Sequence, residues 1–160
     1  MTITLLPATD ADYAIVQNLS AYYLHDMSEF MGWPCPESGR FAGCDEFFED
    51  WRAGRNHPYL LRVDGELAGF AGVKLGPDGE THEIQEFFLL RKFRHQGVGQ
   101  QVAAQLFARF PGPWRVEALI VNVPAVRFWQ SVVTAQGESV TTEVADSPWG
   151  KRQVFRFNYE

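Results

Sequence analysis

The 160-residue chain has few cysteines, few basic residues and no long apolar run. Its two cysteines, Cys35 and Cys44, match no zinc spacing, so we expect free thiols in a reducing compartment and no metal. No apolar run approaches the ~20 residues that cross a membrane as a helix. The N-terminus lacks a basic segment followed by an apolar stretch, so we find no signal peptide and expect a cytoplasmic protein.

The charge balance argues against a nucleic-acid-binding protein. The chain has 14 Lys and Arg residues against 20 Asp and Glu residues, a net charge of −6, and shows no basic face for nucleic acid. An acidic balance weakly favours a cationic substrate such as an amine. The hydrophobic share of 46% and the aromatic share of 14% indicate one packed domain over residues 1–160. The sequence leaves open whether this domain acts as a monomer or a homodimer.

Hydrophobic periodicity and turn residues predict an alternating order of elements. Strands are expected at residues 3–7, 59–63, 67–75, 81–90, 114–121, 138–144 and 153–159, and helices at 11–31, 45–51, 100–110 and 123–134. Asp64-Gly65 predicts a hairpin turn, and Asp45 and Asn122 are the expected N-caps of their helices. The order β-α-α-β-β-β-α-β-α-β-β predicts a mixed sheet in an α/β arrangement.

A two-glycine turn, RHQGVG at residues 94–99, lies where a predicted strand passes into a predicted helix. The first backbone N–H groups of a helix have no intrahelical partner, and the helix dipole is positive there. A phosphate or pyrophosphate fits such a position, and glycine lets it approach the backbone closely. The turn has neither the P-loop spacing nor the dinucleotide G-x-G-x-x-G spacing.

Residues 84–99, ending in Arg-x-x-Gly-x-Gly, resemble the acetyl-CoA-binding motif of the GNAT N-acetyltransferases. Residues 122–129, NVPAVRFW, resemble the N-x-x-A-x-x-F-Y segment of that family, with Trp129 in place of the tyrosine. The run from Phe87 to Trp129 looks most like a bacterial group of predicted acetyltransferases of undefined substrate. The resemblance implies the GNAT (acyl-CoA N-acyltransferase) fold, a mixed, mainly antiparallel sheet with helices on both faces. It also implies acetyl-CoA (coenzyme A) as the donor.

The resemblance implies which residues hold the donor. Pyrophosphate would contact the turn and the helix start, and pantetheine would lie along free backbone groups at the end of the preceding strand. Asn122, beyond its capping role, is expected at the mouth of the gap between two strands. The expected cofactor-binding residues are Phe88, Leu89, Leu90, Arg94, His95, Gln96, Gly97, Val98, Gly99, Gln100, Asn122 and Trp129.

A carboxylate on one of two strands is the expected general base. Glu83 and Glu86 lie on the strand at 81–90 and, being three residues apart, are expected to face opposite sides of the sheet. Glu117 lies on the strand at 114–121. Because Glu86 is flanked by phenylalanines that would raise its pKa if it is buried, we place it first, before Glu83 and Glu117. His82 is a further candidate.

Trp129 changes the expected chemistry of the leaving group. An indole N–H donates a hydrogen bond but supplies no proton at useful pH, so the usual tyrosine acid is missing. A CoA thiol with a pKa near that of cysteine, ~8.5, departs partly as a thiolate. Trp129 is equally compatible with plain core packing.

The acceptor is expected between the first helices and the last hairpin. Aromatic and acidic side chains there suit an amine through cation–π contact and charge. Tyr23, Asp26 and Trp33 are the expected substrate residues, with Tyr22 and Trp149 nearby.

The sequence therefore predicts an acetyl-CoA-dependent N-acetyltransferase acting on a primary amine of a small molecule or peptide. One alternative is a non-catalytic CoA-binding regulatory module that kept the fold and lost the acid. The other is a nucleotide-binding protein that uses the same glycine turn.

Overall fold

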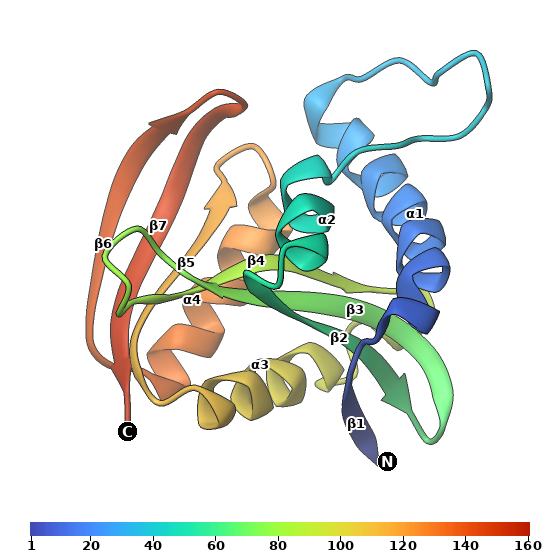
Figure 1. Ribbon diagram of the computed structural model, residues 1–160. Helices are drawn as coiled ribbons and strands as arrows, with labels where there is room; N and C mark the ends of the chain where they lie inside the picture. The colour runs from blue at the N-terminus through green and yellow to red at the C-terminus, as the bar shows by residue number, and fades with distance from the viewer. The chain divides into compact units, whose positions relative to one another are not determined.

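In the computed structural model, which describes residues 1–160, seven strands form one mixed sheet in the order β1-β2-β3-β4-β5-β7-β6 (Figure 1). The strands are β1 (Ile3–Pro7), β2 (Asn56–Val63), β3 (Glu66–Leu75), β4 (His82–Leu89), β5 (Gly112–Leu119), β6 (Glu138–Ser147) and β7 (Gly150–Tyr159). The helices are α1 (Tyr13–Met31), α2 (Asp45–Arg52), α3 (Val98–Arg109) and α4 (Val123–Gln136). Strand β4 pairs with β5 in parallel, whereas the β1–β2, β5–β7 and β6–β7 pairs are antiparallel. The predicted order of elements and the mixed sheet are confirmed.

The chain divides into two compact units. The first comprises residues 1–73 and 85–102, and the second comprises residues 74–84 and 103–160. A single acetyltransferase domain over residues 1–160 stays a prediction.

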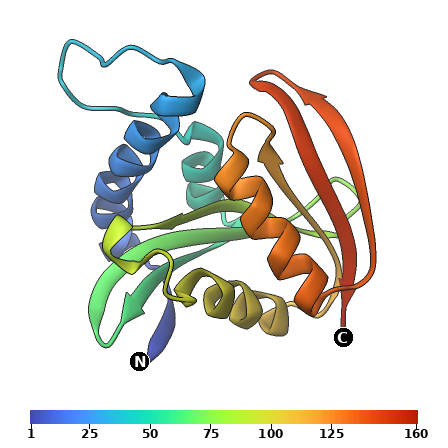
Figure 2. The ribbon, with the colours of Figure 1, turned by 180° about the vertical axis from the view of Figure 1, so that it is seen from behind.

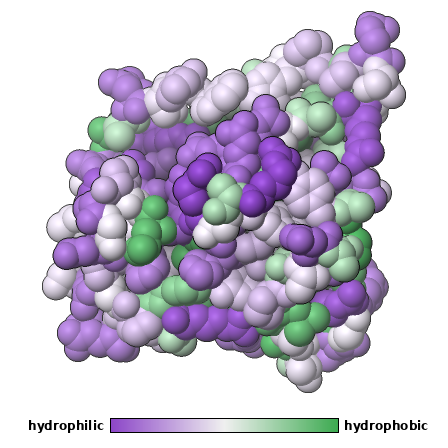
Figure 3. Space-filling view, in the orientation of Figure 1, coloured by the Kyte–Doolittle hydropathy of each residue, from purple (hydrophilic) through white to green (hydrophobic).

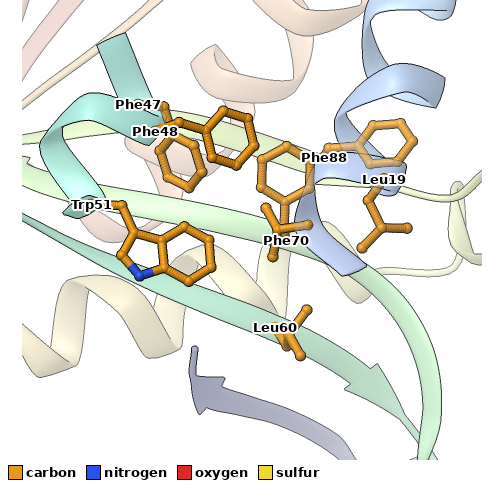
Figure 4. Packing of buried hydrophobic residues seen from close by; sticks show 8 residues of the cluster. Leu19, Phe47, Phe48, Trp51, Leu60, Phe70 and Phe88 are labelled. Atoms are coloured by element: carbon orange, nitrogen blue, oxygen red, sulfur yellow. The ribbon is translucent and has the colours of Figure 1, made fainter. Parts of the chain in front are cut away.

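Aromatic side chains build the core of the first unit (Figure 4). Helices α1 and α2 lie on the same side of β2 and β3 (Figure 1). The core cluster contains Val16 and Leu19 from α1, Phe47, Phe48 and Trp51 from α2, and Leu60, Phe70 and Phe88 from the strands. A Cβ at Gly72 would lie 2.4 Å from the Phe47 ring. Glycine at that position therefore lets α2 approach β3.

Helix α2 begins in a way that the sequence does not predict. Its N-cap is Cys44, not Asp45, and Cys44 has the left-handed φ of 59°. Asp45 is instead the first residue of the helix, where a carboxylate interacts favourably with the helix dipole. The thiol of Cys44 packs against the aromatic core, so this turn is held by burial and not by a capping hydrogen bond.

In the second unit, the two faces of β5 carry different side chains. Trp114 and Val116 are each 1% exposed. The ring centroid of Trp114 lies 4.9 Å from that of Phe107 of α3, and α4 lies beside β5 and β7 (Figure 2). Because strand side chains alternate, Arg115 and Glu117 lie on the opposite face of β5. Asn122 caps α4 as predicted, its Oδ1 accepting from the Ala125 N–H at 3.2 Å.

The surface carries no large apolar feature in the view of Figure 3, where hydrophilic residues predominate and hydrophobic ones form small separate patches. None of the helices is long and apolar enough to cross a membrane. Both cysteines are free, and no group of three or more His, Cys, Asp and Glu side chains is placed to hold a metal ion. A cytoplasmic location stays a prediction.

Candidate functional site

The glycine turn precedes α3 with its backbone exposed. His95, Gln96 and Gly97 are exposed, and His95 and Gly97 have positive φ angles of 59° and 79°. The Gln101 N–H donates to the Gly97 carbonyl at 3.2 Å, so the helical hydrogen bonds begin only there. A Cβ at Gly97 would meet no protein atom within 4 Å. The turn thus leaves open space in front of the helix N-terminus, which fits a phosphate group.

Arg94 lies at the start of the turn, but its side chain is directed back into the first unit. Its Nε donates to the Leu89 carbonyl at 2.9 Å, and its Nη2 donates to Asp26 of α1. Its guanidinium also lies 5.6 Å from the centroid of the Phe88 ring. The predicted contribution of Arg94 to phosphate binding stays a prediction, and the contacts observed here are internal ones.

The end of β4 offers fewer free backbone groups than the sequence predicts. The Leu90 N–H donates to the Ala68 carbonyl of β3 at 2.8 Å, and the Leu89 carbonyl is taken by Arg94. These two groups are already used by β3 and by the Arg94 side chain, so the free backbone groups expected near Phe88 to Leu90 would be other ones. Contacts of pantetheine with Phe88, Leu89 and Leu90 through their other groups stay predictions.

Four charged side chains meet on the face of β5 opposite Trp114 and Val116, in the second unit. Glu83 of β4 is the register partner of Arg115, and its Oε1 lies 3.6 Å from Arg115 Nη1. Glu117 Oε2 lies 2.7 Å from Arg115 Nη2, and Glu117 Oε1 accepts from Arg152 Nη1 at 2.9 Å. Arg115 Nε and Glu117 Oε2 are buried without a partner in hydrogen-bond geometry. The cluster is therefore a half-buried network in which acidic and basic side chains alternate.

Burial shifts the acidity of Glu83. Its side chain is 17% exposed and packs over the turn at residues 76–79, where a Cβ at Gly76 would lie 2.9 Å from Glu83 Oε1. Burial raises the pKa of Glu83 above its ordinary value, although the positive charges of Arg115 and Lys74 act in the opposite direction. A carboxylate in this state suits proton transfer at a pH closer to neutrality.

Glu86 has a different environment, in the first unit. It forms a hydrogen bond with the Cys44 thiol at the start of α2. Burial first, and then the charge and hydrogen bond of Glu86, raise the pKa of Cys44 well above its usual range. Glu83 and Glu86 therefore have separate partners, and the choice between them as the base stays a prediction.

The remaining predicted residues are placed as follows. Trp129 is 5% exposed, and its ring lies 4.9 Å from that of Phe128. Tyr23 packs its ring against Phe70 and Phe88, and Trp33 is half-buried. Asp26 forms ion pairs with Arg91 and Arg94. A substrate role for Tyr23, Asp26 and Trp33, and a cofactor role for Asn122 and Trp129, stay predictions.

Sequence reasoning missed the two arginines of the β5–β7 cluster. Arg115 and Arg152 were not candidates, although Arg115 stands two residues before Glu117 and so shares its face of the strand. That alternation is a signal that the sequence does carry. The pairing that brings Arg152 next to Glu117 depends on the register of β7 against β5, in which Glu117 faces Val154 and Leu119 faces Arg152.

A family model described as the acetyltransferase (GNAT) family matches residues 20–132. The chain belongs to the GNAT family of acetyltransferases. The match includes β4, the glycine turn, α3, β5 and the first turns of α4, which are the segments described above. The acetyl donor of this family is acetyl-CoA.

Solved GNAT structures share the fold at low sequence identity. An acetyltransferase from Thermus thermophilus aligns with a TM-score of 0.68 at 17% identity, covering 99% of this chain and 97% of that one. An aminoglycoside acetyltransferase in complex with coenzyme A aligns with a TM-score of 0.71 at 15% identity, covering 98% and 95%. A ribosomal-protein α-N-acetyltransferase in complex with coenzyme A aligns with a TM-score of 0.67 at 13% identity, covering 99% and 95%. The search of curated proteins found no significant match.

Proposed function

We propose that this GNAT protein transfers an acetyl group from acetyl-CoA to a primary amine of a small molecule or peptide. The observation that carries the proposal is the exposed glycine turn at the N-terminus of α3, inside the segment that matches the family. Two of the similar structures are named as acetyltransferases of an aminoglycoside and of a ribosomal protein's α-amino group. These names support an amine acceptor without selecting one.

The donor would bind through backbone groups of the first unit. The N–H groups of residues 96–100 would hold the pyrophosphate, because nothing in the protein fills the space in front of Gly97. The pantetheine arm would then run along β4 toward Phe88. Binding of this kind needs no dedicated cationic side chain, which agrees with the internal use of Arg94.

Glu83 is the general base in this proposal. Sequence reasoning places Glu86 first, but Glu86 already forms a hydrogen bond with a thiol, whereas Glu83 has a raised pKa and only a long contact with Arg115. The Glu83 carboxylate takes a proton from the acceptor ammonium, and the freed nitrogen forms a bond to the thioester carbonyl carbon. The carbon–sulfur bond breaks and the electron pair leaves with sulfur. The new amide nitrogen gives up its second proton to water, and Glu83 returns the first proton to solvent.

The thiolate would leave without help from a tyrosine. Trp129 stands at the position of the usual acid in the motif, and its side chain is buried in the second unit. A thiol with a pKa of ~8.5 is a tolerable leaving group as the anion. The proton that the thiolate later takes up would come from water.

A turnover screen tests the proposal. Thiol release from acetyl-CoA is measured against a library of small amines, amino acids, aminoglycosides and peptides with free N-termini. Release that depends on both the protein and one class of amine supports the proposal. Binding of acetyl-CoA without turnover of any amine would favour the non-catalytic module, and binding of ATP or NAD in place of acetyl-CoA would favour a nucleotide-binding protein.

A further inference from the structure

We infer that Arg94, the first residue of the glycine motif, is a positioning residue held by Asp26 of α1, and that it acts on the donor through the end of β4 and not through a phosphate. The inference rests on the proposed function, since it concerns how the same donor is bound. It assigns Asp26 to the donor side of the reaction, whereas the sequence predicts a contact with the acceptor.

Asp26 forms ion pairs with two arginines of the segment between β4 and α3. Its Oδ1 accepts from Arg91 Nη2 at 2.7 Å and from Arg91 Nε at 3.2 Å, and its Oδ2 accepts from Arg94 Nη2. The Asp26 side chain is 18% exposed and that of Arg94 33%, while that of Arg91 is 70% exposed. Burial alone would raise the pKa of Asp26, but the hydrogen bonds and charges of Arg94 and Arg91 outweigh it and hold the pKa below its ordinary value. The inner pair, Asp26 with Arg94, is therefore an ionised contact at neutral pH.

Arg94, held by Asp26, in turn fixes the backbone at the end of β4. A trans peptide directs its C=O and its N–H to opposite sides. Because the Leu90 N–H points to Ala68 of β3, the Leu89 carbonyl of the same peptide points away from β3, and Arg94 Nε donates to it there at 2.9 Å. Arg94 thus fixes the last peptide of β4 from one side while β3 fixes it from the other.

The geometry leaves Arg94 poorly placed to act as a phosphate ligand. Its Nε and one Nη are used inside the protein, and its guanidinium lies against the Phe88 ring. Reaching a phosphate in front of Gly97 would break the ion pair with Asp26 and expose the Leu89 carbonyl. The side chain instead holds in place the strand end on which the pantetheine arm is proposed to lie.

A truncated donor separates the two roles. S-acetylpantetheine carries the thioester and the arm but no phosphate. We measure kcat/KM with acetyl-CoA and with S-acetylpantetheine for the wild type, Arg94→Met, Asp26→Asn, the double variant and Gly97→Asn. Asparagine adopts the left-handed backbone readily, so Gly97→Asn keeps the turn and fills the phosphate space.

If Arg94 and Asp26 are positioning residues, Arg94→Met and Asp26→Asn should each lower kcat/KM at least tenfold, and by the same factor for both donors. Each variant should also raise the KM of the donor but not the KM of the acceptor. The double variant loses no more than the worse single variant, and Gly97→Asn loses activity with acetyl-CoA only. A loss confined to acetyl-CoA in Arg94→Met would overturn the inference and make Arg94 a phosphate ligand. If Asp26→Asn raises only the KM of the acceptor, Asp26 contacts the acceptor amine and does not act on the donor.

Amide hydrogen exchange tests, without measuring turnover, whether Asp26 and Arg94 hold the end of β4 in place. Asp26→Asn should speed exchange of the Leu90 and Phe93 amides at least tenfold in the protein without ligand, while Arg115→Gln in the second unit leaves them unchanged. Unchanged exchange at Leu90 in Asp26→Asn contradicts the inference. If the wild type releases no thiol from either donor but exchange rises as stated, the proposed function fails and the positioning of the strand end stands.

Discussion

The Glu83 carboxylate and the Arg115 guanidinium lie 3.6 Å apart on neighbouring strands, with a second carboxylate, Glu117, on the other side of the arginine at 2.7 Å. The closer pair is thus Arg115 with Glu117. Glu83 is left with a weak partner, a half-buried position and a raised pKa. This asymmetry distinguishes the two carboxylates as proton acceptors.

Replacing Glu83 by Gln should lower kcat by at least a hundredfold, because a general base contributes typically 10²–10⁴-fold. Affinity for acetyl-CoA should stay nearly unchanged, since the proposed donor contacts belong to the glycine turn and the end of β4. Steady-state kinetics and calorimetry measure the two effects. Glu86→Gln and Glu117→Gln are the matched controls, and a comparable loss in either of them with an active Glu83→Gln would move the base to that residue.

The acid limb of the kcat/KM profile should move in opposite directions in two variants. The base works only when deprotonated, so activity falls as pH falls through the pKa of Glu83. The charge of Arg115 lowers that pKa and the charge of Glu117 raises it. Arg115→Gln should therefore shift the limb to higher pH and Glu117→Gln to lower pH, as measured by pH–rate profiles. Shifts of the same sign, or none, would show that another group titrates.

Trp129 should be dispensable as a proton donor. Trp129→Phe removes the indole N–H and some volume but no acid, so turnover should stay within roughly tenfold of the wild type. Some loss of stability is expected, because the side chain is 5% exposed and packs in the core. A thousandfold loss of kcat in a variant that remains folded and binds acetyl-CoA normally would assign the indole a catalytic role.

Gly69 should tolerate no side chain. A Cβ there would lie 1.9 Å from the Phe88 carbonyl oxygen, so β3 and β4 must move apart to accept alanine. Gly69→Ala should lower the free energy of unfolding by ~1–3 kcal/mol or more, as overpacking does, measured by urea denaturation. Gly43→Ala is the control, because its Cβ meets only the movable end of Leu24 at 3.1 Å. Equal stability of the two alanine variants would contradict the close approach of the strands.

Periodicity and turn chemistry are enough to predict most of the fold. The first strand has the predicted bounds, Ile3–Pro7, and Asp64 and Gly65 form the hairpin turn with positive φ angles of 48° and 81°. Asn122 caps its helix as expected, because a capping side chain acts on backbone only three residues away. These features depend on neighbours in sequence.

The site depends on contacts that sequence neighbours do not determine. Asp26 and Arg94 are separated by 68 positions, and Arg152 and Glu117 by 35. Strict alternation also fails in β4, where Gln85 donates to Asp50 of α2 at 2.7 Å and Phe88, three residues on, packs against the α2 core. An argument from alternation could therefore not place Glu83 relative to Glu86.

Calorimetric titration with acetyl-CoA, on the wild type and on Gly97→Asn, tests the central claim most directly. The wild type should bind, and a ligand at 100 times its Kd should stabilise the folded protein by about 2.7 kcal/mol. Gly97→Asn should keep the fold and the melting temperature without ligand but lose the binding, because its side chain enters the space that the phosphate needs. No heat of binding to the wild type at millimolar acetyl-CoA, or equal binding by Gly97→Asn, would contradict the account.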